Sequence, residues 1–97
     1  MNEKPKIKVL VVDDSALARR VITDALERDP EITVVGNANN GKTAVFKSFT
    51  LDPDVITMDI EMPIMNGIDA LREIIRVNPK PVIMMSVLTQ YGAEVTF

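Results

Sequence analysis

Three aspartates of this sequence lie where chemistry is expected. Two of them directly follow a short apolar run, and the third is next to one of these two. Asp13 and Asp14 come after the run 7–12, and Asp59 comes after the run 55–58. Carboxylates that lie close together repel one another, so they raise each other's pKa or bind a cation. Their hard oxygen atoms suit Mg²⁺, which keeps several waters and takes one or two protein carboxylates. The three residues therefore predict a Mg²⁺ site, provided that the fold brings them together.

The two apolar runs are the elements that must position these carboxylates. Both are short, uncharged or nearly so, and rich in β-branched residues, which is typical of strands buried in a parallel sheet. The carboxyl ends of parallel strands share one edge, where open α/β sheets bind ligands. Structural roles are also open: Asp59 as a turn former, and Asp13 and Asp14 as the acidic start of a helix with Ser15 as its N-cap.

Short strands and helices alternate along the chain without hairpin turns. We expect further strands at 32–35, closing at Gly36, and at 81–85. We expect helices from Ser15 to Asp29-Pro30, from about Lys42 to Leu51, and from Asn66-Gly67 to Asn78-Pro79. This alternation predicts βαβ units and a doubly wound parallel sheet, which is an α/β fold.

Helical spacing predicts which side chains share a face of each helix. The sets are Leu17, Val21, Ala25 and Leu26; Ala44, Val45 and Ser48; and Ile68, Leu71, Ile74 and Ile75. Phe46 and Phe49 cannot both point inward with the second set, so one of them is expected at the surface.

Composition limits the function. The 97 residues allow one domain, 1–97, with 46% hydrophobic and 26% charged residues, as in an ordinary globular protein. A net charge of −3 argues against a general nucleic-acid or membrane binder. Cysteine and histidine are absent, which excludes thiolate chemistry and Cys or His metal sites. There is no signal-peptide or membrane-spanning run, so we expect a cytoplasmic protein.

The segment 36–43 offers a rival function. Gly36 to Thr43 fits the phosphate-loop pattern G-x-x-x-x-G-K-[ST], and the run ending at Asp59 resembles a Walker-B strand. A phosphate-loop nucleotide-binding domain is therefore the alternative. It leaves Asp13 and Asp14 without a role, and Asn39-Asn40-Gly41 is equally well explained as a turn and helix cap.

The motifs together resemble a known family. The segments 9–15 and 54–63, Asn66-Gly67, and a strand leading to Ser86 resemble the receiver domain of two-component response regulators. The amino-acid sequences of segments 57–63 and 86–94 are most similar to the N-terminal regulatory domain of chemotaxis protein-glutamate methylesterases, CheB. A haloacid-dehalogenase-type phosphatase is a third hypothesis, but Asp59-Ile60-Glu61 imitates its motif only loosely, with Pro63 where that family has Thr or Val.

The resemblance implies a fold, a site and partners. The fold would be a flavodoxin-like, CheY-like sheet. Asp59 would accept a phosphoryl group from a chemotaxis histidine kinase, and Ser86 would sense the phosphate. Asp14, Asp59 and the backbone carbonyl of Glu61 would bind Mg²⁺, with Asp13 acting through a water. The chain itself would be a regulatory switch and not an enzyme, controlling a methylesterase domain in the parent protein.

The chain also departs from the family pattern. The pattern continues with a fourth helix, a fifth strand that ends in a phosphate-pairing lysine, and a fifth helix, so we expect a receiver domain truncated after its fourth strand. Lys42 and Lys80 do not match that lysine, and Val87 stands where the family has a smaller residue. The exposed edge of strand 81–85 predicts a homodimer or strand exchange, unless a longer protein supplies the missing part.

Overall fold

The computed structural model describes residues 4–85, and these form four strands and three helices. In chain order the elements are β1 (Ile7–Val12), α1 (Ala16–Leu26), β2 (Ile32–Ala38), α2 (Gly41–Thr50), β3 (Val55–Asp59), α3 (Gly67–Val77) and β4 (Val82–Met85). The alternation of strands and helices predicted from the sequence is confirmed. No helix in this described part of the chain is long and apolar enough to cross a membrane.

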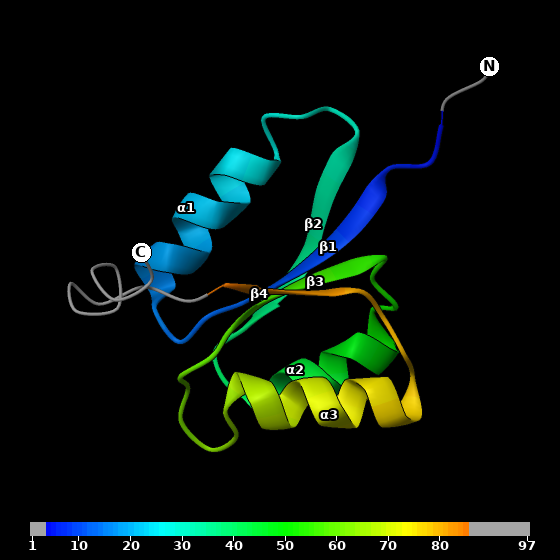
Figure 1. The fold of residues 1–97 in the computed structure, drawn as a ribbon. Helices are drawn as coiled ribbons and strands as arrows, with labels where there is room; N and C mark the ends of the chain where they lie inside the picture. Colours follow the sequence, from blue (N-terminus) through cyan, green and yellow to red (C-terminus); the bar gives the residue numbers. More distant parts are fainter. Residues whose placement is uncertain (1–3, 86–97) are drawn as a thin grey trace, which may run out of the picture.

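The four strands form one parallel sheet in the order β2-β1-β3-β4. β1 lies in the centre and pairs with β3 from Val9 opposite Val55 to Val12 opposite Met58. This pairing brings the carboxyl ends of β1 and β3 to the same edge of the sheet, as Figure 1 shows. The doubly wound parallel α/β fold predicted from the sequence is therefore confirmed, including the neighbouring positions of the two acid-bearing strands.

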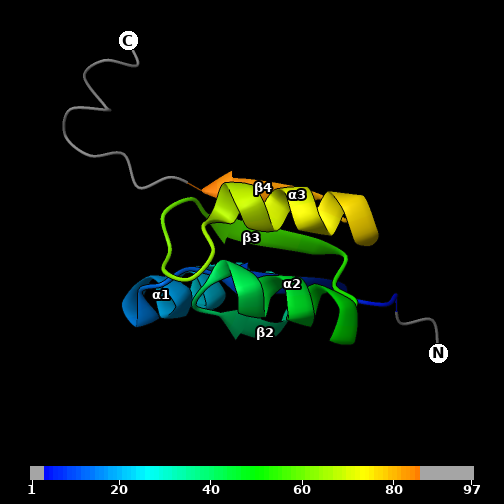
Figure 2. The same cartoon turned by 90° about the horizontal axis from the view of Figure 1, so that it is seen from below.

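Helices cover the two faces of the sheet unequally. α1 lies on one face, and α2 and α3 lie side by side on the other, as Figures 1 and 2 show. The buried core lies between the sheet and the α2–α3 pair. It consists of Leu10, Val12, Ala38, Ala44, Ile56, Met58, Ala70 and Ile74. Burial of these apolar side chains is the main force that fixes the strands in their order.

The apolar stripe predicted for the first helix is mostly exposed. Leu17 is 72% and Val21 is 57% exposed, and α1 has no fully buried residue. The stripe one position further along, through Ala18 and Ile22, is half-buried instead. Leu26 belongs to both sets and is also half-buried. Two apolar stripes lie next to each other on this helix, so spacing alone could not show which one packs on the sheet.

Two smaller expectations were wrong. β2 does not close at Gly36 but continues to Ala38, because a register shift between Val9 and Leu10 of β1 lets the strand pass the glycine. Phe46 and Phe49 are both exposed, at 65% and 45%, whereas only one was expected at the surface.

Each helix begins with a polar cap that the sequence shows directly. The side chains of Ser15, Asn40 and Asn66 accept hydrogen bonds from the backbone N–H groups of the third residue after each. These caps satisfy amide groups that lack partners within the helix. Two of them, Ser15 and Asn66, also fix the helices that follow the acid-bearing strands. The caps therefore determine where the chain turns at the carboxyl edge of the sheet.

Candidate functional site

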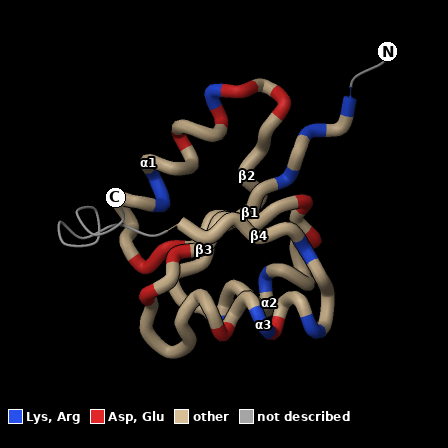
Figure 3. The backbone as a smooth tube through the Cα atoms, in the orientation of Figure 1, with Lys and Arg blue, Asp and Glu red and all other residues tan. Residues whose placement is uncertain are grey.

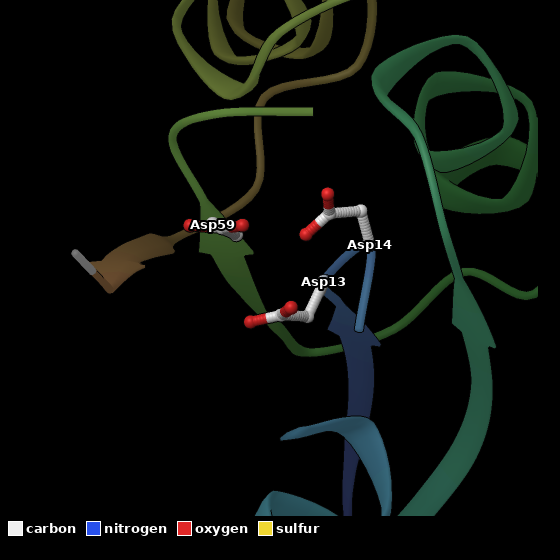
Figure 4. A group of neighbouring side chains, drawn as sticks. All are labelled: Asp13, Asp14 and Asp59. Carbon is white, nitrogen blue, oxygen red and sulfur yellow. The ribbon is translucent and has the colours of Figure 1, made fainter. Parts of the chain in front are cut away.

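Asp13, Asp14 and Asp59 come together at the carboxyl edge of the sheet. One carboxylate oxygen from each residue lies within 4.8 Å of the other two. Figure 4 shows Asp13 and Asp14 at the end of β1 and Asp59 at the end of β3, around a common space. The convergence predicted from the two apolar runs is therefore present in the structure, and it follows from the parallel pairing of β1 with β3.

The charges in this cluster are poorly solvated. Asp13 is 6% and Asp59 is 9% exposed, whereas Asp14 is exposed to solvent. Burial raises the pKa of Asp59 above its usual value, and the negative charges of Asp13 and Asp14 raise it further. The N–H of Ile60 donates to Asp59 Oδ1 at 2.8 Å and partly offsets this rise in pKa. Three ionised carboxylates in such surroundings are more stable with a bound cation than without one.

The turn after β1 holds Asp13 through three hydrogen bonds. Its carboxylate Oδ1 accepts the N–H of Ser15 at 2.9 Å, and its own N–H donates to the carbonyl of Ala38 at 3.0 Å. The guanidinium Nη1 of Arg19 donates to the Asp13 carbonyl at 2.8 Å. The contact from Arg19 could not be predicted from the sequence, because a basic residue in the second turn of a helix gives no separate signal.

Two glycines allow the loop between β3 and α3 to pack closely beside the acidic site. The N–H of Gly67 donates to the carbonyl of Ile60 at 2.7 Å, and a Cβ at Gly67 would lie 1.9 Å from the Asp59 carbonyl oxygen. The N–H of Gly41 donates to the carbonyl of Met65 at 2.8 Å, and a Cβ there would lie 2.3 Å from the same oxygen. Neither position therefore has room for a side chain, and both require glycine.

Ile64, in the same loop, has an unfavourable backbone conformation. Its φ is +71°, and its side chain is 78% exposed. A β-branched residue in the left-handed region loses about 1–2 kcal/mol relative to an ordinary conformation. We expect Ile64→Asn to raise the free energy of unfolding by about 1 kcal/mol, because Asn tolerates this region. Urea denaturation measures the change. Ile75→Asn, at a half-exposed helical position, is the control and should not stabilise the protein.

Thr57 is a buried polar residue for which the sequence predicts no role. It is 5% exposed, and its hydroxyl has no hydrogen-bond partner among residues 4–85. Thr57 and Asp59 are two residues apart in β3, so their side chains project from the same face of the sheet. Threonine is common in β-strands, so its presence in an apolar run does not by itself indicate a functional role.

The segment that fits the phosphate-loop pattern is not a free loop. Residues 36–38 belong to β2, and α2 begins at Gly41. The N–H groups of Gly41, Thr43 and Ala44 donate to Met65 O, Asn40 Oδ1 and Asn40 O, respectively. Amide groups that a phosphate loop would direct at a ligand are thus already bonded within the protein. The turn and cap interpretation explains these residues.

Other predicted site residues are only partly described. Glu61 lies in the exposed loop that follows β3, two residues after Asp59. The role of its backbone carbonyl stays a prediction. Ser86 and Val87 lie outside the described residues, as does the helix that could begin at Gln90.

A β2-β1-β3-β4 parallel sheet with three clustered aspartates at its carboxyl edge is the arrangement that the resemblance to signal receiver domains implied. Residues 9–96 match the family described as the response regulator receiver domain, and the chain belongs to this family. This family match gives no support to the alternative of a phosphate-loop nucleotide-binding domain.

Several curated relatives are named protein-glutamate methylesterase/protein-glutamine glutaminase. The chain is 60% identical to the protein-glutamate methylesterase/protein-glutamine glutaminase of Idiomarina loihiensis over 93% of its length, but it covers 23% of that relative. The response regulator domain of Thermotoga maritima CheB has a TM-score of 0.84 and 54% identity, with 94% of this chain and 68% of that chain covered. The resemblance to CheB receiver domains is therefore confirmed.

A chain of a second solved structure is also similar. The CheX–CheY–BeF₃–Mg²⁺ complex of Borrelia burgdorferi has a TM-score of 0.80 and 31% identity, with 90% of this chain and 67% of that chain covered. This chain is a receiver domain, and it spans about a quarter of the length of the curated methylesterases that it matches.

Proposed function

We propose that this receiver domain is a phosphorylation-dependent switch that accepts a phosphoryl group on Asp59. The donor would be a phosphohistidine on a chemotaxis histidine kinase. The observation that carries the proposal is the cluster of Asp13, Asp14 and Asp59, whose carboxylate oxygens lie within 4.8 Å of one another. The similarity to CheB receiver domains supports the assignment to chemotaxis.

Asp59 is the carboxylate best placed to act as nucleophile. Its Oδ1 accepts the N–H of Ile60, which orients the group and leaves Oδ2 for the incoming phosphorus atom. In the transfer, an O–P bond to Asp59 forms as the P–N bond of the phosphohistidine breaks, and the product is an aspartyl phosphate. Because nucleophile and phosphoryl group are both anionic, repulsion between them is the main barrier that the site must reduce.

The residues of the site fit a Mg²⁺ ion. Asp14 and Asp59 would bind the ion directly with the backbone carbonyl of Glu61, and Asp13 would act through a water. An all-oxygen set with few carboxylates is the donor set that Mg²⁺ prefers. The bound ion would neutralise charge on the phosphoryl oxygens. The protein's own part is to hold Asp13 and Asp14 in a fixed turn, through the bonds from Ser15 and Arg19.

The consequence of phosphorylation would depend on the rest of the parent protein. The relatives are named methylesterases, and this chain corresponds to about a quarter of their length. We therefore propose that the phosphorylated receiver controls a methylesterase domain in the parent chain, in the cytoplasm. The hydroxyl of Ser86 would turn toward the phosphate and move its loop, which converts a local hydrogen bond into a change of state.

The edge of β4 bears on assembly. Ile83 and Met85 are 55% and 38% exposed on this strand, and β4 has β3 as its partner among the described strands. Unpaired apolar edges attract other strands. We propose that the isolated chain dimerises through β4. A constant monomer mass in size-exclusion chromatography with light scattering, across a hundredfold range of concentration, would contradict this.

Intact-mass measurement after exposure to acetyl phosphate tests the function. We expect one phosphoryl adduct on the wild-type chain, which requires Mg²⁺, and no adduct on Asp59→Asn. Asp24→Asn is the matched control, because it removes one carboxylate from the exposed face of α1 and should leave the adduct in place. An adduct that persists in Asp59→Asn, or that forms equally without a divalent cation, would refute the assignment.

A further inference from the structure

A polar cavity lies beside α1, next to the turn at Asp13 but not lined by the three clustered aspartates. It has two adjoining parts, of about 290 Å³ and about 170 Å³, which share Arg19 and Asn37 as lining residues. The larger part is bounded by α1 and the smaller one extends to α2. Asp13, Asp14 and Asp59 line neither part. We call the two parts together the α1–α2 cavity.

The lining of the α1–α2 cavity is basic in a protein whose net charge is −3. Three cationic side chains line it, Arg19, Arg20 and Lys47, against the single carboxylate of Asp24. Arg20 and Asp24 form an exposed ion pair at 3.9 Å, so this carboxylate offsets only Arg20. Figure 3 shows the basic turn of α1 next to the acidic end of β1. Arg19 and Lys47 therefore remain as a local excess of positive charge.

Two of these cations are held in place by backbone groups. Arg19 donates from Nη1 to the Asp13 carbonyl at 2.8 Å, and Lys47 donates from Nζ to the Asn37 carbonyl at 2.6 Å. Both side chains are half-buried. Each bond uses one donor, and a guanidinium has five N–H donors and an ammonium three. Cations that are already ordered lose less conformational entropy when an anion binds.

We propose that the α1–α2 cavity binds a small oxyanion, with inorganic phosphate or a phosphate monoester as the class of ligand. The planar guanidinium of Arg19 matches two oxygens of such a group, and Lys47 supplies a second positive charge. The amides of Asn37 and Asn39 and the hydroxyl of Thr43 add neutral donors around them. The part of the cavity that Arg19 and Lys47 both line has a volume of about 170 Å³, which is smaller than the sites that hold drug-sized ligands, so it fits a group of a few heavy atoms.

This binding mode differs from that of a phosphate loop, although residues 37–39 and Thr43 belong to the pattern noted in the sequence. The N–H groups of Gly41 and Thr43 are bonded within the protein. Recognition would therefore come from side chains of α1, of α2 and of the end of β2 with the turn after it, and it would require neither Mg²⁺ nor the acidic cluster. The proposal is independent of phosphoryl transfer at Asp59.

An NMR titration of the ¹⁵N-labelled chain with inorganic phosphate tests the proposal, with chelator present and ionic strength held constant. We expect saturable shifts of the amides of Asn37, Asn39 and Thr43. Lys47→Gln should weaken the affinity by about threefold to fivefold, as expected for losing one partly exposed charge contact. Arg19→Gln should weaken it more, because it removes the paired donors.

The matched control is Arg72→Gln, which removes the same charge from the exposed face of α3 and should leave the affinity unchanged. Shifts that fail to saturate and spread over lysines and arginines of the whole surface would overturn the proposal. An unchanged affinity in folded Lys47→Gln would overturn it as well. Arg19 also supports the turn at Asp13, so Arg19→Gln is a valid test only if its spectrum keeps the chemical-shift dispersion of the wild type. If it does not, the result for Lys47→Gln decides.

Discussion

Gly67→Ala is expected to lower the free energy of unfolding by about 3 kcal/mol, which is at the upper end of the usual overpacking penalty. The added Cβ would lie 1.9 Å from the carbonyl oxygen of Asp59 and 2.9 Å from its carbonyl carbon. Backbone atoms at the end of a paired strand cannot move aside as the tip of a side chain can. The change must therefore displace either the start of α3 or the end of β3, which carries Asp59.

Urea denaturation measures the effect of Gly67→Ala, and Gly36→Ala is the control. A Cβ at Gly36 would first meet the Cδ1 of Leu51, at 2.5 Å, which is the end of a flexible side chain, so the loss should be about 1 kcal/mol or less. Helix propensity alone predicts the opposite sign at Gly67, because Ala is favoured over Gly within a helix. A stabilised Gly67→Ala variant would therefore show that the close contact with Asp59 is not rigid.

The order of elements and the acidic cluster could be predicted from sequence because both follow from short-range patterns. Apolar runs ended by charged residues marked β1 and β3, and prolines and asparagines marked where the helices end and begin. Parallel strands place their carboxyl ends at one edge, so the convergence of Asp13 and Asp59 needed only that β1 and β3 be neighbours. The sequence pattern does not show whether β1 and β3 are neighbours, and in the structure they are.

The features that were missed depend on contacts between distant segments. Gly41 and Gly67 look like ordinary turn glycines, and only the packing of the β3–α3 loop shows that a Cβ would clash there. The choice between the two apolar stripes of α1 depends on where the helix lies over β1 and β2. Arg19 is one of two adjacent arginines, and nothing in its spacing shows that it bonds to the Asp13 carbonyl. Local pattern cannot contain this information.

Asp59→Asn is expected to stabilise the protein at neutral pH when no divalent cation is present, because the variant removes an ionised group that burial disfavours. Asp59 is buried beside Asp13 and Asp14, so its ionised form is disfavoured and its pKa lies above the usual 3.8. Below pH 3.8 the folded and unfolded states both hold the proton, and the stability of the wild type carries no penalty. As the pH rises from 3.8 through the folded-state pKa, the unfolded state gives up this proton before the folded state does, so the wild type loses stability over that interval. The asparagine variant does not.

Mg²⁺ is expected to reverse this order. A cation that binds the three carboxylates stabilises the folded wild type by RT ln(1 + [Mg²⁺]/Kd), about 2.7 kcal/mol when the concentration is a hundred times Kd. Asp59→Asn lacks one of the carboxylates and should gain much less. Thermal and urea unfolding of both chains, with chelator and with Mg²⁺, measures the crossing. The exposed control Asp24→Asn should respond to Mg²⁺ as the wild type does. If wild type and Asp59→Asn gain equally, the ion binds elsewhere, and the three clustered aspartates are not its site.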